Sequence, residues 1–586
     1  MTGTERTALP PPPLDDLADE LAGAWGCWAP TLTHDGHRMA YLSDRRGIPE
    51  LWVGSVEGEE PATVVKLSDD PVLAVRWSPD GHWLACSVAT GGGVRSEVWV
   101  VRPNGSNGRR LAGDPEHAAL GPWSRRGHQV VITIRDDTRQ ENRCVLFDPE
   151  TGSEEQIAAG ELVEVLDLSA DGRFALLRDG TRGAHFCMLL DRRTDTVRDV
   201  LPHPGTGSTE YGLLRPPPSD EDATLVAYLV TDAGQPRPAL VAVPLGDDGG
   251  RAQAGSIAQR DDGELEFADA DDRGDRVLLV WNVEGRSELE LLDTISGERQ
   301  RFDGLPGSVV SSAVMARDGV RAVLAVEGPS FPPSLWLLDL GSGAWRPLAI
   351  SVSGDHQCIV PTLERFESHD GLTITGWLYR PADAPAGGPA VVSIHGGPES
   401  QERPVFHPQH QLLAAAGIVV FAPNIRGSSG FGRAFVHADD RFGRLDAIAD
   451  VAASAEWLVA EGLADPEHIA VSGRSYGGYV TLMALILYPG LFAGGVDTCG
   501  MSDLTTFFRD TEPWIATAAV TKYGDPVQDA TLLANLSPLH HVDRIRVPVL
   551  VVHGELDTNV PVNESHQVVA ALEQLSREVE YLELPG

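Results

Sequence analysis

The 586-residue sequence has little cysteine, a shortage of basic residues and no long apolar run. Its six cysteines show no C-x-x-C spacing, which argues against a disulfide framework or a cysteine-based zinc site. Because 85 acidic residues outnumber 46 basic ones, the net charge of -39 disfavours binding to nucleic-acid phosphates and anionic membranes. No apolar run approaches the roughly 20 residues of a membrane helix, and no basic-then-apolar leader opens the sequence. We therefore expect a cytoplasmic protein with reduced thiols that binds neither nucleic acid nor membranes.

The composition is that of a folded protein, and the length predicts several domains. Hydrophobic residues make up 42% of the chain and charged residues 22%. The prolines from Pro10 to Pro13 cannot continue a helix and predict an extended lead-in. Apolar residues then recur at helical spacing from Leu14 to Leu21. We assign residues 1–25 to an N-terminal extension whose helix packs on another domain.

Residues 26–352 repeat one pattern seven times, with a period of roughly 45 to 50 residues. Each copy is an apolar strand, a polar turn rich in Asp and Gly, and a second apolar strand. The turns of the seven copies end at or near Gly36, Gly81, Gly127, Gly172, Asp222, Gly274 and Gly319. The regular spacing predicts a seven-bladed β-propeller of four-stranded blades rather than a stack of unrelated hairpins.

From residue 353 onward, short apolar strands alternate with helical stretches. Parallel strands buried on both faces are continuously apolar, and the runs of this kind are 391–394, 418–421, 469–471 and 549–552. Helical patterns, such as the one at 447–460, separate them. This alternation predicts an α/β domain with a mainly parallel sheet over residues 353–586.

The strongest chemical signal is a G-x-S-x-G sequence from Gly473 to Gly477, placed between an apolar strand and a helical run. In this context it predicts a sharp nucleophile elbow, where small flanking residues avoid collisions. The turn would expose the Ser475 hydroxyl at the carboxyl end of the strand. A helix N-terminus beneath it favours developing negative charge. We therefore expect Ser475 to be the nucleophile of a serine hydrolase.

A glycine-rich loop, His-Gly-Gly-Pro at 395–398, directly follows another apolar strand. Loops of this type present a backbone N–H group to an oxyanion. The second donor in such sites is the N–H of the residue after the nucleophile, which here is Tyr476. We expect the N–H groups of Gly397 and Tyr476 to form the oxyanion hole.

An acidic residue, Asp557, comes just after the apolar strand that ends near Val552. The acid of an α/β-hydrolase triad belongs at this place, and its position after Ser475 in the chain is the correct order. Its carboxylate would orient a histidine and stabilise the imidazolium. His553 lies on the same loop and is interpreted as structural, because the base normally follows the acid.

These motifs, together with Asn-Ile-Arg-Gly-Ser-Ser-Gly-Phe-Gly at 424–432, resemble the prolyl oligopeptidase family, in particular its acylaminoacyl-peptidase-like branch. The resemblance covers essentially the whole chain. It implies a seven-bladed propeller that caps an α/β-hydrolase domain, with the active site between them and open to short, unfolded peptides. It also implies that the N-terminal helix packs on the hydrolase domain, and it requires no metal or organic cofactor.

The resemblance extends to the substrate contacts. Asn559, two residues after the acid, falls where relatives hold the carbonyl of the residue before P1, and Asn there favours a substrate with a free amino terminus. Val560 would line the S1 pocket. Phe507, Phe508 and Trp514 are candidate walls of that pocket, and core packing accounts for these three aromatics equally well.

The catalytic base departs from the family pattern. Relatives carry their histidine roughly thirty residues after the acid, past a strand and a glycine-rich turn. Here the approaching strand occupies 578–584, and the sequence given ends at Gly586. His566 lies in a helical run too soon after Asp557. We therefore expect the base just beyond Gly586 and near inactivity of the 586 residues alone.

Three functions are compatible with these features. The preferred one is a serine peptidase of aminopeptidase, dipeptidyl-peptidase or acylaminoacyl-peptidase type, which acts through an acyl-enzyme. The second is an esterase or amidase of aminoacylated small molecules such as amide antibiotics. The third is a non-catalytic propeller interaction protein, against which the intact elbow and acid argue. The sequence leaves the oligomeric state open, a homo-oligomer included.

Overall fold

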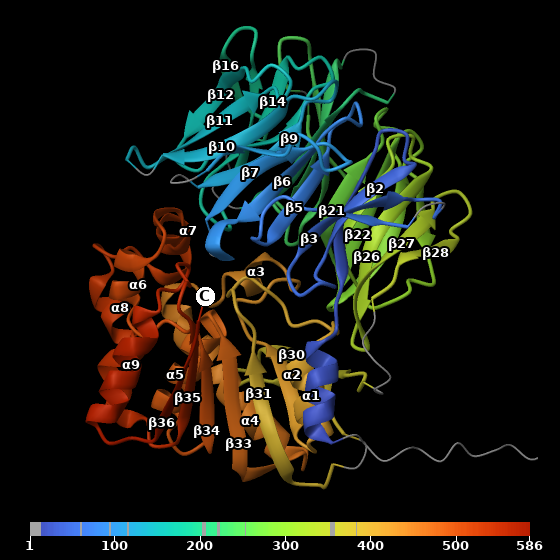
Figure 1. Ribbon diagram of the computed structural model, residues 1–586. Helices are drawn as coiled ribbons and strands as arrows, with labels where there is room; N and C mark the ends of the chain where they lie inside the picture. The colour runs from blue at the N-terminus through green and yellow to red at the C-terminus, as the bar shows by residue number, and fades with distance from the viewer. Residues whose placement is uncertain are drawn as a thin grey trace, which may run out of the picture.

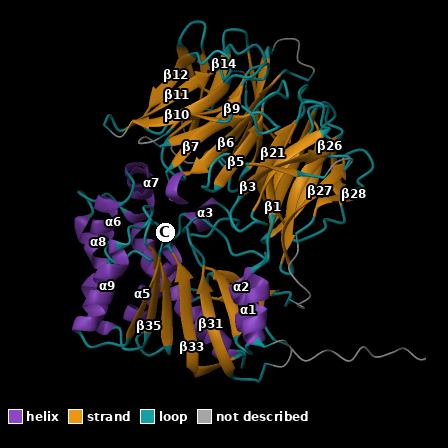
Figure 2. Ribbon diagram, in the orientation of Figure 1, coloured by secondary structure: helices purple, strands orange, loops and turns teal. Residues whose placement is uncertain are grey.

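The computed structural model describes the chain at 13–58, 61–92, 95–113, 117–136, 138–201, 207–218, 223–251, 253–351, 358–381 and 384–585. The predicted proline lead-in before Pro13, the fifth repeat's turn and the predicted boundary at 352/353 lie outside these residues. A propeller sits above the carboxyl edge of a second, open sheet (Figures 1 and 2). The predicted fold class, a propeller followed by an α/β-hydrolase domain, is confirmed.

Seven four-stranded antiparallel sheets form the propeller within the described residues, so the predicted blades are confirmed. The first two blades are β1 (Cys27–Leu32), β2 (Arg38–Ser43), β3 (Glu50–Ser55), β4 (Thr63–Val65), and β5 (Val72–Trp77), β6 (Leu84–Ala89), β7 (Ser96–Val101), β8 (Arg109–Ala112). The next two are β9 (Ala118–Trp123), β10 (Val130–Asp136), β11 (Glu141–Phe147), β12 (Glu154–Gly160), and β13 (Glu164–Leu168), β14 (Phe174–Asp179), β15 (Phe186–Asp191), β16 (Thr196–Asp199). The fifth is β17 (Thr209–Arg215), β18 (Leu225–Thr231), β19 (Ala239–Leu245), β20 (Gly255–Ala258). The last two are β21 (Glu264–Ala270), β22 (Arg276–Val283), β23 (Arg286–Asp293), β24 (Arg299–Phe302), and β25 (Val309–Met315), β26 (Arg321–Gly328), β27 (Phe331–Asp339), β28 (Trp345–Ala349).

The repeated Asp-Gly turn has a local physical cause, which the second blade illustrates. Gly81 adopts a left-handed backbone conformation with φ of +73°, which a side chain would disfavour. One residue earlier, Asp80 Oδ1 accepts hydrogen bonds from Ser78 Oγ at 2.7 Å and from the His82 N–H at 3.0 Å. In this blade, the turn is thus closed by the side chain of the Asp that precedes the glycine.

The ring closes without a shared strand. Each blade is built from four consecutive strands, so no strand of the first blade completes the last one. The two blades meet through buried apolar side chains, among them Tyr41 of β2 and Val323 and Leu335 of β26 and β27. Side-chain packing, rather than backbone pairing, therefore joins the ends of the ring.

The second domain contains one eight-stranded sheet in the order β29-β30-β32-β31-β33-β34-β35-β36. Its strands are β29 (Thr362–Glu367), β30 (Thr373–Tyr379), β31 (Gly388–Ile394), β32 (Val419–Asn424), β33 (Ala464–Arg474), β34 (Gly494–Thr498), β35 (Val549–Gly554) and β36 (Val579–Leu584). Strands from β32 to β36 pair in parallel, whereas β29, β30 and the β30–β32 pair are antiparallel. The parallel core and the continuously apolar strands agree with the sequence pattern.

Helices cover both faces of this sheet (Figure 2). They are α2 (Pro408–Ala415), α3 (Arg433–Val436), α4 (Arg444–Ala460), α5 (Tyr476–Leu487), α6 (Leu504–Asp510), α7 (Pro513–Tyr523), α8 (Ala530–Asn535) and α9 (Asn563–Gln574). Short 3₁₀ turns lie at Thr90–Gly92, Arg441–Gly443 and Pro538–Arg544. The helix α5 is buried along nearly its whole length against β33 and β34.

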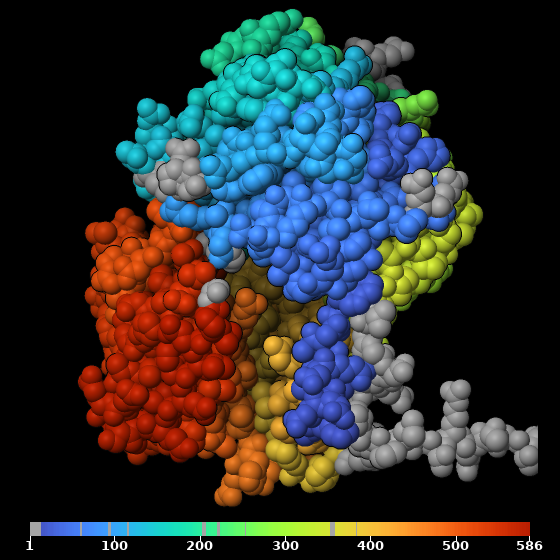
Figure 3. All heavy atoms as spheres, viewed as in Figure 1, coloured from blue at the N-terminus to red at the C-terminus, as the bar shows by residue number. Residues whose placement is uncertain are grey.

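The N-terminal helix α1 (Leu14–Ala22) lies against α2 of the hydrolase domain, although it directly precedes the first blade in the sequence (Figures 1 and 3). Leu17 and Leu21 are its buried side chains. In the described ranges, no helix is both long and apolar enough to cross a bilayer. All six cysteines are free, and all except the half-buried Cys358 are buried, as the sequence predicts.

Candidate active site

Ser475 occupies a strained turn between β33 and α5. Its φ of 57° and ψ of -118° are rare for a residue with a side chain. Two backbone hydrogen bonds hold it there. The Ser475 N–H donates to the Thr498 carbonyl at 2.8 Å, and its own carbonyl accepts from the Tyr479 N–H at 3.0 Å. The side chain stays half-buried at the carboxyl edge of the sheet, above the N-terminus of α5.

The glycines around Ser475 are sterically required. A Cβ atom added to Gly473 would lie 2.3 Å from the Gly477 carbonyl, and one added to Gly477 would lie 2.2 Å from the Ile394 carbonyl oxygen. A Cβ on Gly478 would lie 2.3 Å from Asp497 Oδ1. These contacts are impossible for real side chains, so the turn admits only glycine at these positions. The predicted strand-elbow-helix context is present.

The His-Gly-Gly-Pro loop lies beside the serine. A Cβ built on Gly396 would be 3.6 Å from Ser475 Cβ, which places this loop in contact distance of the elbow. The next residue, Gly397, is exposed and has φ of +131°. Tyr476 is the first residue of α5, so its N–H has no acceptor within the helix. The first turn of α5 and the loop that carries Gly397 thus both lie next to Ser475.

His395, the first residue of the loop, is engaged elsewhere. Its Nε2 lies 2.8 Å from Ser428 Oγ, and its Nδ1 lies 2.6 Å from the Gly396 carbonyl oxygen. Burial lowers the pKa of this imidazole. The ring therefore anchors the loop to the Asn-Ile-Arg-Gly segment that precedes α3.

The Tyr476 side chain belongs to a buried charge cluster that the sequence motifs do not reveal. The Arg444 guanidinium lies 4.7 Å from the Tyr476 ring centre and pairs with Asp439 at 2.8 Å. Asp439 also accepts from the Tyr476 hydroxyl at 3.2 Å and pairs with Lys522 at 3.0 Å. All four side chains are almost fully buried. This cluster fixes the first turn of α5 from below.

Asp557 follows β35, two strands away from the elbow strand. Its Oδ1 accepts the N–H groups of Asn559 at 2.9 Å and Val560 at 3.0 Å, which orients the carboxylate. Its side chain keeps 25% of its surface exposed. The carboxylate is therefore fixed by its own loop and remains partly exposed.

Cys499 links the two loops. Its N–H donates to the Val552 carbonyl at 2.8 Å, and the residue has a left-handed φ of 44°. Burial raises the pKa of the Cys499 thiol, the Ser475 backbone and Arg474 oppose the rise, and Asp557 adds to it. Cys499 thus lies between the elbow strand and β35, the strand that leads to Asp557.

Neither nearby histidine is placed as a base. His553 is fully buried, with Nδ1 at 2.7 Å from Ser565 Oγ and Nε2 at 2.8 Å from the Val560 carbonyl oxygen. Burial lowers its pKa. His566 lies in α9 and pairs with Glu583 at 2.7 Å. Among the described residues, no histidine hydrogen-bonds to Ser475 or Asp557.

The candidate substrate residues divide into two groups. Asn559 is exposed beside Asp557, and its backbone carbonyl accepts a hydrogen bond from Thr511 Oγ1 at 2.7 Å. Val560 is buried. Phe507 and Phe508 are buried in α6, with ring centres 5.7 Å apart in an edge-on arrangement. Core packing thus accounts for most of their surface. Trp514 differs, since it is half-buried at the start of α7 and faces the propeller.

The contact between α7 and the propeller borders a cavity of about 210 Å³. Trp514 stacks on His117 with ring centres 4.6 Å apart, and both residues line the cavity with Glu164. Next to it, Arg95 of the propeller binds Glu512 through two hydrogen bonds of 3.0 and 2.9 Å. On the face shown in Figure 3, the surface is hollowed between the blue blades and the red C-terminal helices. The sequence contains no pattern that pairs these residues, because the contacts join distant segments.

The fold and the site define a serine hydrolase of the α/β-hydrolase class that carries a propeller cap. Residues 404–586 match the sequence profile of the prolyl oligopeptidase family. The match covers most of the hydrolase domain, and together with relatives named as peptidases it supports a serine peptidase.

The relatives resemble different shares of the chain. Dipeptidyl aminopeptidase BIII of Pseudoxanthomonas mexicana is 24% identical over 94% of this chain and 82% of its own. Human acylamino-acid-releasing enzyme is 24% identical over 53% of this chain and 45% of its own. Among solved structures, a puromycin-hydrolyzing peptidase of Mycobacterium tuberculosis superposes with a TM-score of 0.81 at 20% identity, over 99% of this chain and 94% of that one.

Proposed function

We propose that this chain cleaves amide bonds of short peptides with a free amino terminus, through an acyl-enzyme on Ser475. Ser475 Oγ attacks the carbonyl carbon while a histidine takes its proton, and the N–H groups of Tyr476 and Gly397 stabilise the oxyanion. The C–N bond then breaks, the histidine returns the proton to the leaving amine, and water hydrolyses the ester. Asp557 orients the histidine and stabilises its charged form.

The observation that carries this proposal is the strained backbone of Ser475 at the head of α5, with the Gly396 loop beside it. Strain of this kind persists only where the surrounding structure enforces it, and here glycines and buried groups enforce it on all sides. A propeller that only binds partners has no use for a serine held in this way at the sheet edge. The geometry therefore favours catalysis over a purely structural role.

The geometry of β36 supports a base on the segment that follows this strand. β36 runs parallel to β35, and the Glu555 N–H donates to the Leu584 carbonyl at 2.9 Å. The chain leaving β36 therefore emerges beside the loop that carries Asp557. A histidine placed a few residues after β36 would therefore lie on the same side of the sheet as Asp557.

The substrate class rests on the cap and on Asn559. The propeller covers the site, so a substrate must be short or unfolded enough to enter between the domains. The exposed amide of Asn559, adjacent to the acid, suits the carbonyl of an N-terminal peptide unit. The full-length relative named for dipeptidyl aminopeptidase activity is consistent with a free amino terminus. We place the enzyme in the cytoplasm on the basis of its six free cysteines.

The test uses the protein expressed from its natural reading frame, including whatever follows Gly586. A fluorophosphonate probe is expected to label the wild type, whereas Ser475→Ala should show no labelling. Labelling of Ser475→Ala at the wild-type level would contradict the assignment. Absence of labelling in both proteins would instead favour the non-catalytic alternative.

A substrate panel then separates the enzyme classes. It contains dipeptidyl, aminoacyl and N-acetylaminoacyl anilides, an aminoacylated aromatic amide, and a matched ester. Cleavage of the free-amine anilides by the wild type, with loss in Ser475→Ala, is the expected result. Preference for the acetylated anilide would overturn the free amino terminus, and hydrolysis of the ester alone would indicate an esterase.

A further inference from the structure

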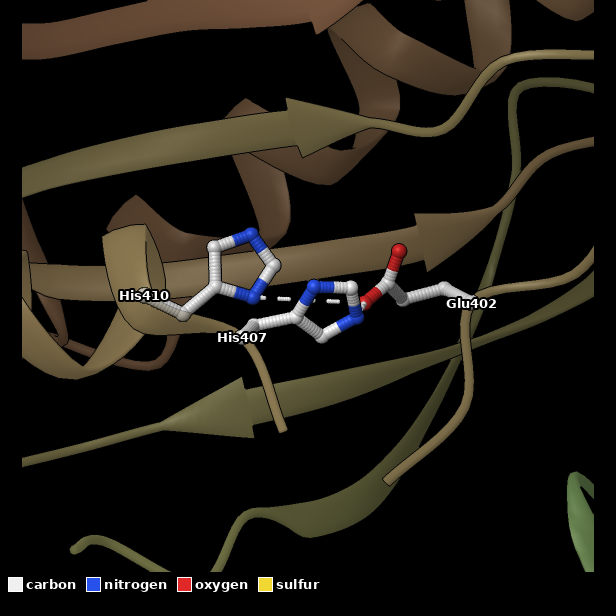
Figure 4. A group of neighbouring side chains, drawn as sticks. All are labelled: Glu402, His407 and His410. Atoms are coloured by element: carbon white, nitrogen blue, oxygen red, sulfur yellow. Dashed lines mark ion pairs between the residues drawn. The ribbon is translucent and has the colours of Figure 1, made fainter. Parts of the chain in front are cut away.

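Three side chains that can bind a metal lie together between β31 and α2, outside the serine site (Figure 4). Glu402 Oε1 is 2.9 Å from His407 Nε2 and 3.9 Å from His410 Nδ1. The three donor atoms all lie within 4.8 Å of one another. Figure 4 shows both imidazole rings directed toward one end of the carboxylate. Glu402 and His410 are buried, and His407 is half-buried.

The hydrogen bonding of this group is incomplete among the described residues. His410 Nδ1 is buried and makes no hydrogen bond, and the same holds for the hydroxyl of Tyr379, whose ring packs edge-on against His410. Glu402 Oε1 forms an ion pair with His407 Nε2 at 2.9 Å and has no other hydrogen-bond donor among the described residues. Native proteins rarely leave several buried polar atoms unpaired in one place. The group therefore has donor capacity to offer a ligand.

The orientation of His410 is set from its other side. Its Nε2 lies 3.0 Å from Ser393 Oγ on β31. When Nε2 donates this hydrogen bond, Nδ1 carries the free lone pair and points toward Glu402. Histidines that bind metals are held by such a hydrogen bond from the second ring nitrogen.

We propose that Glu402, His407 and His410 bind a divalent transition-metal ion, with zinc as the favoured ion. Two imidazoles and one carboxylate form a donor set that zinc uses in proteins. Zinc bonds to nitrogen and oxygen measure about 2.0 to 2.2 Å, so donor atoms around a tetrahedral ion are about 3.3 to 3.5 Å apart. The spacings of 2.9 and 3.9 Å bracket that range. Magnesium and calcium are disfavoured because they prefer oxygen ligands.

The location indicates a structural role at the interface between the domains. Arg403, next to Glu402, donates to the Gly285 carbonyl at 2.9 Å and to Glu266 Oε1 at 2.8 Å in the propeller. Glu327 of β26 interacts electrostatically with His407 from the propeller side. A zinc ion would join the segment that docks on the sixth and seventh blades to helix α2. We therefore expect zinc to stabilise the assembled two-domain protein.

The test measures zinc directly. The natural full-length protein is loaded with zinc, dialysed against metal-free buffer and analysed for metal content and thermal unfolding. About one zinc ion per chain should remain, and the unfolding temperature should be higher in zinc than in EDTA. Cobalt substitution should give the visible absorption of a tetrahedral nitrogen–oxygen site.

Three variants and one control decide the matter. His410→Ala, and His407→Ala at the more exposed position, should each weaken zinc binding more than about tenfold and abolish the zinc-dependent rise in unfolding temperature. Ser393→Ala should weaken binding about tenfold while preserving the ligands. His468→Ala, which removes a surface histidine paired with Asp465 at 2.9 Å, should behave as the wild type.

Two results would overturn the site. One is a wild-type protein that retains no zinc, which would mean that the group holds only an ion pair and water. The other is full zinc retention by a correctly folded His407→Ala protein. Neither readout depends on peptidase activity, so the zinc site and the serine site can fail independently.

Discussion

At the scale of single residues, the site depends on positions where only one residue type fits. Ser475 tolerates its left-handed φ because Thr498 and Tyr479 hold both of its backbone polar groups. The glycines beside it leave no room for a methyl group. Strain and crowding therefore combine to present one hydroxyl group at the sheet edge.

Gly477→Ala is expected to damage both stability and catalysis. The added methyl would approach the Ile394 carbonyl oxygen, a backbone atom that cannot move aside. We expect a loss of about 1 to 3 kcal/mol in unfolding free energy and loss of fluorophosphonate labelling. Urea unfolding checks the first and gel fluorescence the second. Gly490→Ala, where the added Cβ meets nothing within 4 Å, is the matched control and should leave both unchanged.

Asp557→Asn should separate catalysis from folding. The Asn side-chain oxygen can still accept the N–H groups of Asn559 and Val560, so the loop should keep its shape. The base would lose the charge that stabilises its protonated form, so we expect kcat to fall roughly 10³- to 10⁴-fold with an unchanged unfolding temperature. Steady-state kinetics on the natural full-length protein give the comparison. A fall of less than tenfold would show that Asp557 is not the acid.

At this scale, the sequence predicts the residues that lie within short motifs and misses those that meet through the fold. Gly473 and Gly477 follow from the elbow pattern alone. Arg444 and Asp439 under Tyr476 do not, because a buried ion pair has no signature in a chain rich in surface charge. The grouping of His407 and His410 with Glu402 is not predicted for a related reason. Glu402 lies on an irregular loop, whose path the sequence pattern does not specify.

At the scale of elements, the end of β34 holds a buried acid beneath the elbow. Asp497 Oδ1 accepts the Gly500 N–H at 2.9 Å, while Oδ2 has no hydrogen-bond partner among the described residues. Burial raises the pKa of Asp497 from 3.8 to about 7. This strand end is therefore a proton-binding position within the hydrolase core.

The Asp497 carboxyl should make stability fall as pH rises. Because the folded pKa exceeds the unfolded one, the folded state binds the proton more tightly, and stability is lost between about pH 4 and pH 7. Asp497→Asn should remove this loss. From about pH 4 to pH 8, the variant should gain on the wild type by at most about 4 kcal/mol. Urea unfolding at both pH values measures the difference, and parallel curves for the two proteins would contradict it.

The elements themselves were largely predictable. The repeated turn, rich in Asp and Gly, specifies a hairpin locally, so its seven copies predict seven blades. The continuous apolar runs likewise identified the parallel strands. What no periodicity encodes is which loops of the two domains meet, and the pairing of Trp514 with His117 belongs to that class.

At the scale of the whole molecule, the contact between α7 and the propeller joins the two domains beside a cavity lined by His117 and Trp514. Glu512 is almost fully buried there and relies on Arg95 for its charge pairing. The stacked Trp514 and His117 rings extend the same contact. Any separation of α7 from the propeller must break the Arg95–Glu512 and Trp514–His117 contacts.

Arg95→Gln should therefore relax the size limit for substrates. We expect Arg95→Gln to cleave longer peptides faster relative to a dipeptidyl anilide than the wild type does. This difference between the two proteins should be larger at low salt, because salt screens the ion pair of the wild type. Competition between peptides of graded length, followed by mass spectrometry, measures the ratio. Arg139→Gln, which removes an exposed charge from the turn between β10 and β11 of the third blade, serves as the control. An unchanged ratio in Arg95→Gln would exclude this contact as a gate.

The closure of the ring by side chains alone has a mechanical consequence. The chain enters the propeller from α1, which is anchored on the hydrolase domain, and returns to that domain after β28. Both ends of the propeller are thus connected to the hydrolase domain, which holds the first and last blades together. Cleavage of the chain between α1 and β1, or after β28, should let the first and last blades separate before any other pair. Hydrogen exchange should then increase first in β2 and β26.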